Sequence, residues 1–147
     1  MIAGIAFGPE SGFLVGAISA LASNFFYSQG PYTPWQMMAY GAGGMLAGFV
    51  FAEGRLPSKP VIMGIFGFLA VTFFVGPLLD TCSVFLVMSR ISLKGAMAFY
   101  ISGFPVNLRQ AVATAIVLLV LGKPLLEKLD RIKTKYGILD DEGGKEA

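Results

Sequence analysis

The chain has 147 residues, of which 55% are hydrophobic and only 14% charged, and its mean hydropathy is +0.71. In an ordinary soluble domain about a quarter of the residues are charged, so this composition excludes an ordinary soluble domain. The formal net charge is only +2, and we expect the lipid bilayer, not nucleic acid, to surround the protein.

Residues 11–52 contain no charged side chain. A membrane span needs about 20 apolar residues, so this stretch is long enough for two spans. We predict four spans in all: 10–28, 34–52, 60–80 and 105–123. Their apolar residues do not alternate with polar ones as barrel strands do, and helices satisfy their own backbone hydrogen bonds in lipid. The sequence therefore predicts an all-α, polytopic helical membrane bundle.

The first seven residues are apolar but too short to span a membrane, and Gly8 and Pro9 follow them. They lack the basic region and cleavage site of a signal peptide. We interpret them as the end of an earlier helix whose beginning is missing.

Orientation follows from the basic side chains. Lys and Arg are frequent after residue 122 and occur in the loop between the second and third spans. Because basic residues favour the cytoplasmic side, we expect a cytoplasmic C-terminus in the plasma membrane and an external Gln29–Gln36 loop. We predict one domain, 1–136, whose amphipathic extension 124–136 lies at the interface, followed by a disordered cytoplasmic tail, 137–147.

The catalytic repertoire is small. The chain has no His, a single cysteine (Cys82) and no Gly-rich phosphate loop. A nucleophilic pair with His, a zinc site and unaided ATP hydrolysis are therefore excluded within this chain. We expect neither an enzyme nor a resident metal or cofactor.

Small residues recur at helical spacing in the first two predicted spans. They are Gly12, Gly16 and Ala20 in the first, and Gly41, Gly44 and Gly48 in the second. Such stripes let helices pack closely, and they also provide a surface for coupling to another membrane protein. Asn24 follows at the same spacing, and its amide needs either a neighbouring helix or a ligand as its partner.

Aromatic and amide side chains gather around the external loop. The candidate ligand-binding residues there are Asn24, Tyr27, Gln29, Tyr32, Trp35, Gln36 and Tyr40. An aromatic belt at the membrane interface explains some of the aromatic residues. It does not explain two glutamines and two prolines in a charge-free loop, so we favour a binding role.

The Gly76–Pro77 pair is expected to break or kink the third helix before Asp80. Residues 81–104 then contain two short apolar stretches, which we interpret as interfacial or re-entrant helices. Pro105 is expected to begin the last span, because proline suits a first helical turn.

Asp80, Asn107 and Arg109 are expected to lie at the outer mouth, near the ligand. Arg109 has three open roles: its side chain reaches the lipid headgroups, pairs with Asp80 or binds an anionic ligand.

Several of these motifs resemble the substrate-specific (S) component of energy-coupling factor (ECF) transporters. They are Phe7–Pro9, Gly12–Ala17, Ser23–Phe26, Gln29–Pro31, Thr33–Met37 and Gly103–Asn107. The resemblance implies a six-helix bundle that binds a vitamin near the outer face. It also implies partnership with a membrane coupling protein and two cytoplasmic ATPases.

Against that fold, the first helix and most of the second are expected to be missing here. The pattern is most similar to members assigned to cobalamin uptake. Two other functions stay open: a non-transporting helical scaffold or accessory subunit, and a standalone channel or carrier, which the scarcity of intramembrane charges disfavours.

Overall fold

The structure is a computed structural model, and it describes residues 1–51, 55–90 and 92–137. Every regular element in this part of the chain is a helix, which confirms the all-α prediction. The helices are α1 (Ile2–Phe7), α2 (Pro9–Tyr27), α3 (Thr33–Phe51), α4 (Pro60–Ala70), the π-helical segment η1 (Val71–Val75), α5 (Gly76–Val87) and α6 (Leu93–Tyr136).

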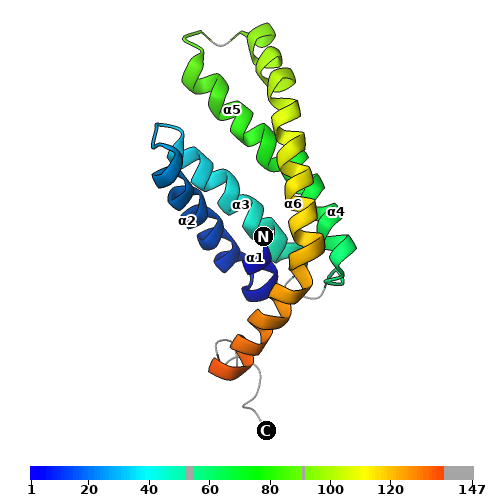
Figure 1. The fold of residues 1–147 in the computed structure, drawn as a ribbon. Helices are drawn as coiled ribbons and strands as arrows, with labels where there is room; N and C mark the ends of the chain where they lie inside the picture. The colour runs from blue at the N-terminus through cyan, green and yellow to red at the C-terminus, as the bar shows by residue number, and fades with distance from the viewer. Residues whose placement is uncertain (52–54, 91, 138–147) are drawn as a thin grey trace.

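Helices α2 and α3 form an antiparallel pair and lie side by side (Figure 1). A Cβ atom added to Gly44 would lie 2.1 Å from the Gly12 carbonyl oxygen. The two backbones are therefore in direct contact, which only small residues permit. Helix α1 joins this pair, because a Cβ atom on Gly4 would also meet the Gly44 carbonyl oxygen, at 2.2 Å.

The third helix does not break at Gly76–Pro77. Helical residues run from Pro60 to Val87 through η1, and the Gly76 N–H bonds to the Val71 carbonyl oxygen, five residues back. Of the two expected outcomes, a break or a kink, the break is therefore wrong, and the kink stays a prediction. A π-helical turn widens the helix where the Pro77 ring would otherwise crowd the preceding turn.

Helix α6 begins at Leu93 and contains Pro105 in its interior. The prediction of separate short helices over 81–104, with a last helix that begins at Pro105, is therefore wrong. A proline removes one backbone hydrogen bond, and side-chain bonds to a neighbouring helix offset this cost. Here α5 supplies them on both sides of Pro105, through Thr81 to Tyr100 and through Asp80 to Asn107.

Two continuous helical stretches of the described chain are long and apolar enough to cross a membrane, Pro60–Val87 and Leu93–Tyr136. Helices α2 and α3 have 19 residues each. At 1.5 Å per residue each is roughly 28 Å long, close to the thickness of the hydrocarbon core. Their role as spans stays a prediction. The segment 124–136 continues α6, and residues 138–147 of the predicted tail lie outside the described residues.

The buried apolar cluster lies where α1, α3, α4 and α6 meet. Its members are Ile5, Ala6, Ala47, Phe51, Met63, Leu118 and Leu126. The Phe51 and Phe66 rings meet edge to face there, with centroids 5.2 Å apart. This cluster joins the α1–α3 half of the molecule to the α4–α6 half. Toward the loop that connects α2 to α3, the two halves are separated by a cavity.

Candidate ligand-binding cavity

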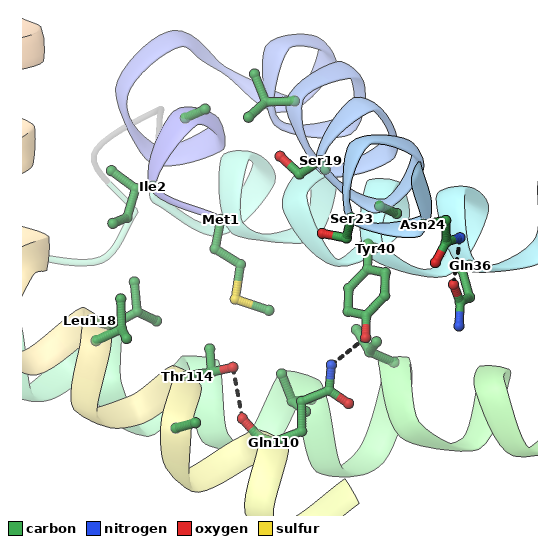
Figure 2. Close-up of a pocket in the computed structure, with 18 of the residues that line it drawn as sticks. Met1, Ile2, Ser19, Ser23, Asn24, Gln36, Tyr40, Gln110, Thr114 and Leu118 are labelled. Carbon is green, nitrogen blue, oxygen red and sulfur yellow. Dashed lines mark hydrogen bonds between the residues drawn. The ribbon is translucent and has the colours of Figure 1, made fainter. Parts of the chain in front are cut away.

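A cavity of about 760 Å³ lies between the α2–α3 pair on one side and η1 and α6 on the other (Figure 2). Ligand sites for small molecules typically have 300–1,000 Å³ and a mostly apolar lining with a few polar groups. The lining fits this description. Its polar side chains are those of Ser19, Ser23, Asn24, Tyr27, Gln36, Tyr40, Gln110 and Thr114.

Asn24 organises the wall formed by α2 and α3. It is 7% exposed, and its Nδ2 donates to Thr33 Oγ1 at 3.2 Å and to Gln36 Oε1 at 2.8 Å. Thr33 Oγ1 also accepts from the backbone N–H of Gly30 at 3.3 Å. The amide of Asn24 thus has the neighbouring helix as its partner. Through Thr33 it also ties the connecting loop to Gln36 on the cavity wall.

Tyr40 and Gln110 approach each other from opposite walls (Figure 2). The Gln110 Nε2 donates to the Tyr40 hydroxyl oxygen. One turn further along α6, Thr114 Oγ1 donates to the Gln110 carbonyl oxygen at 2.8 Å. A polar bridge therefore joins α3 to α6 across the cavity.

Sequence reasoning missed Gln110, Thr114, Ser19 and Ser23. Their spacing is the signal that was available, since Ser19 and Ser23, like Gln110 and Thr114, are four residues apart on otherwise apolar helices. Residues four apart share a helix face, so each pair predicts one polar face.

Of the ten predicted ligand-binding residues, the structure brings Asn24, Tyr27, Gln36 and Tyr40 to the cavity. Gln29 lies exposed in the loop, and the Tyr32 hydroxyl donates to the Ser28 carbonyl oxygen at 3.0 Å. Neither side chain lines the cavity.

Trp35 also lies outside the cavity lining. Its Nε1 donates to the Leu78 carbonyl oxygen at 2.6 Å, and its ring lies 6.4 Å from that of Phe85, centroid to centroid. The indole therefore fastens α3 to α5 beside the cavity. The N–H of a partly buried Trp needs such an acceptor, which explains the position of the ring.

Asp80, Asn107 and Arg109 also lie outside the lining. Asn107 is buried, and its Nδ2 donates to Asp80 Oδ2 at 2.7 Å. The carboxyl group is seated against Gly103, where a Cβ atom would lie 2.3 Å from Asp80 Oδ1. These contacts fasten α5 to α6. Arg109 is exposed, and Asp80 has Asn107 as its partner in this part of the structure.

The glycines of the predicted small-residue stripes face one another. Cβ atoms added to Gly12, Gly16 and Gly44 would lie within 2.4 Å of a carbonyl oxygen of the partner helix. A Cβ atom on Gly48 would meet Pro9 at 2.4 Å, and one on Gly41 would meet the Phe13 ring at 2.9 Å. The stripes are thus occupied within the chain, while Gly16 and Ala20 also border the cavity.

The described residues contain no group of three or more His, Cys, Asp or Glu side chains that could hold a metal ion. The cavity is instead suited to an uncharged organic ligand, because none of its lining side chains carries a charge.

A comparison with protein families matches residues 1–127 to the family described as ECF-type riboflavin transporter, S component. No curated protein and no solved structure matches the chain. The match confirms the S-component resemblance and does not support the expected cobalamin specificity, since the family is named for riboflavin. An S component is a multi-pass plasma-membrane protein that works with an ECF module, so it is a transporter component and not an enzyme. With a match over most of its length, the chain belongs to the family of ECF-type riboflavin transporter S components.

Proposed function

We propose that this chain captures riboflavin in the cavity between the α2–α3 pair and α6. The chain would then deliver the vitamin through the coupling protein and ATPases of an ECF module. The observation that carries this proposal is the cavity itself, about 760 Å³ in volume, with uncharged polar groups on both walls. The family description supplies the ligand.

The size and chemistry of the cavity favour a flavin over a corrinoid. Riboflavin is an uncharged, drug-sized molecule with a flat ring system and a polyol chain, and a cavity of this volume buries such a ligand. Cobalamin is several times larger and carries a metal in a bulky corrin ring. We therefore place riboflavin before the cobalamin that the sequence motifs favoured.

The orientation predicted from the basic residues belongs to the same proposal. A cytoplasmic C-terminus places the loop between α2 and α3 outside the cell, on the side from which a nutrient arrives. Membrane-impermeant thiol labelling of whole cells tests it. With Cys82 replaced by Ser, Gln29→Cys, at an exposed position of the loop, should react, and Lys145→Cys should be protected.

Riboflavin binding by the purified protein is the decisive experiment. Riboflavin fluorescence should be quenched on titration with the protein in detergent, with a sub-micromolar dissociation constant, and excess cobalamin should not compete. Ser23→Trp, which places an indole in the cavity, should abolish the quenching. A protein that binds neither vitamin would support a scaffold, and competition by cobalamin would restore the earlier assignment.

Transport is a separate test. Uptake should require co-expression of the coupling protein and ATPases, because the chain has no phosphate loop of its own. Riboflavin accumulation against a gradient by this chain alone would contradict the proposal.

A further inference from the structure

The Tyr40–Gln110 hydrogen bond is the one side-chain bond between α3 and α6 in the part of the chain that the structure describes. It crosses the cavity, and both residues line it (Figure 2). No Cα atom of α2 lies within 8 Å of a Cα atom of α6 in these residues. A ligand that fills the space between the walls must therefore lie against the Tyr40–Gln110 bridge.

The bridge leaves specific groups free for a ligand. The Gln110 side-chain amide has two N–H donors and one carbonyl oxygen, and Tyr40 uses one of the donors. Because the Tyr40 oxygen accepts that bond, its own O–H remains available to donate. The bridge thus offers a carbonyl acceptor, Gln110 Oε1, together with a hydroxyl donor from Tyr40.

A second amide, that of Gln36 on the α3 wall, is oriented in the opposite sense to Gln110. Gln36 Oε1 accepts from Asn24 Nδ2 at 2.8 Å, so this bond leaves the N–H donors of the Gln36 amino group unused. Asn24 is buried, and its Nδ2 also donates to Thr33 Oγ1, which holds its amide in this orientation. The cavity therefore presents one acceptor from Gln110 and donors from Tyr40 and Gln36.

We propose that the Tyr40–Gln110 bridge is the specificity-determining element of the cavity and that it reads a ring amide edge, –C(=O)–NH–, on the ligand. The ligand N–H donates to Gln110 Oε1, and the adjacent ring carbonyls accept from Tyr40 and Gln36. This inference rests on the proposed function, since the ring system of riboflavin carries such an edge, with one N–H between two carbonyls. Any uncharged flat heterocycle with that edge belongs to the same ligand class.

The bridge should reject a ligand that lacks the N–H. When a ligand displaces water from the cavity, Gln110 Oε1 needs a donor, and a buried acceptor without one is costly. 3-Methylriboflavin replaces the ring N–H by N–CH₃ and leaves the rest of the molecule intact. The protein should bind riboflavin about tenfold or more tightly than this analogue.

Three variants separate a reading role from a merely structural one. Gln110→Met keeps the length of the side chain and removes the acceptor, so it should weaken riboflavin binding about tenfold and affect the methyl analogue little. Gln110→Asn withdraws the amide by one methylene and should also lower the preference. Tyr100→Phe is the matched control, because it removes a hydroxyl bond between α5 and α6, to Thr81, outside the cavity.

The outcomes are distinguishable. Equal binding of the two flavins by the parent chain would overturn the inference and leave riboflavin binding intact. Equal weakening of both flavins by Gln110→Met, or by Gln110→Asn if the Met variant does not fold, would show that the bridge only holds the helices. If the parent chain binds neither flavin, the proposed function fails and the inference fails with it.

Discussion

The two sides of α3 face different surroundings. On one side, Gly44 lies against the backbone of Gly12 in α2 with no side chain between them. On the other side, Tyr40 reaches across a cavity to Gln110 of α6. The α2–α3 interface is therefore closely packed, whereas the interface between the two halves of the molecule encloses a cavity.

Beyond the buried cluster, side-chain hydrogen bonds join the two halves. In the described residues they run from Trp35 to Leu78, from Tyr40 to Gln110 and from Lys133 to Ala6. The contact between glycine backbones cannot be relieved by rotation of a side chain, because a carbonyl oxygen moves only together with its helix. A single hydrogen bond contributes about 1 kcal/mol and re-forms with another partner. From this difference between the two interfaces, we expect the α2–α3 pair to move as one body and the ligand to be accommodated between the two halves of the molecule.

The largest effect is expected at the α2–α3 interface. Gly44→Ala places a Cβ atom 2.1 Å from a carbonyl oxygen, and overpacking of this kind costs about 3 kcal/mol or more when backbone opposes it. The free energy of unfolding, measured with SDS in mixed micelles, should fall by that amount. Gly43→Ala is the control, because its Cβ would meet side chains and no backbone atom: Val75 at 2.8 Å and Met1 at 3.6 Å. If both variants unfold alike, the backbone contact is not what holds the pair together.

The sequence was sufficient to predict the helices and the positions of the small residues. Charge-free stretches specify apolar helices, and glycines four residues apart on one helix face allow a close approach. Sequence alone could not locate the ends of the long helices. Pro77 and Pro105 are strong local breakers, and their cost is offset by a π-helical turn in one case and by bonds from α5 in the other.

The cavity was only half predictable. Asn24, Gln36 and Tyr40 could be predicted from the sequence, because they lie near one loop and are polar residues in a charge-free segment. Gln110 and Thr114 belong to a helix about 70 residues away along the chain, and only the fold brings that helix opposite α3. The sequence singled out Trp35 as an aromatic residue near the loop. It could not predict the hydrogen-bond partner of Trp35, because a backbone carbonyl oxygen of α5 has no sequence signal.

A second prediction tests the bond between α3 and α5. Trp35→Ala removes the bond to Leu78 and the ring contact with Phe85, and should lower the free energy of unfolding by about 2 kcal/mol, below the range for a fully buried Trp. Trp35→Phe keeps a ring and loses the N–H, so it should cost about 1 kcal/mol. Equal losses for the two variants would mean that the hydrogen bond alone matters.

A third prediction concerns the bond between α5 and α6. Asp80→Ala and Asn107→Ala should each be destabilising, and the double variant should cost less than the sum, with a coupling of about 1 kcal/mol. The reason is that each single variant leaves the other polar group without its hydrogen-bond partner. The same SDS titration measures all three variants. Strict additivity would show that Asp80 has another partner, for which Arg109 is the first residue to examine.

The smallest effect is expected at the bond between α6 and α1. Lys133 Nζ donates to the Ala6 carbonyl oxygen at 2.6 Å and lies 5.7 Å from the centre of the Phe7 ring. The last carbonyls of a helix have no partner within the helix, and a cation there is favourable. Lys133→Met keeps the apolar stem and removes the charge, so it should cost about 1 kcal/mol. Lys128→Met is the control, because Lys128 is exposed. Ligand affinity should stay unchanged in both, since neither residue lines the cavity. A loss of riboflavin binding in Lys133→Met alone would mean that the position of α1 controls the cavity, and that the halves are coupled more tightly than one hydrogen bond implies.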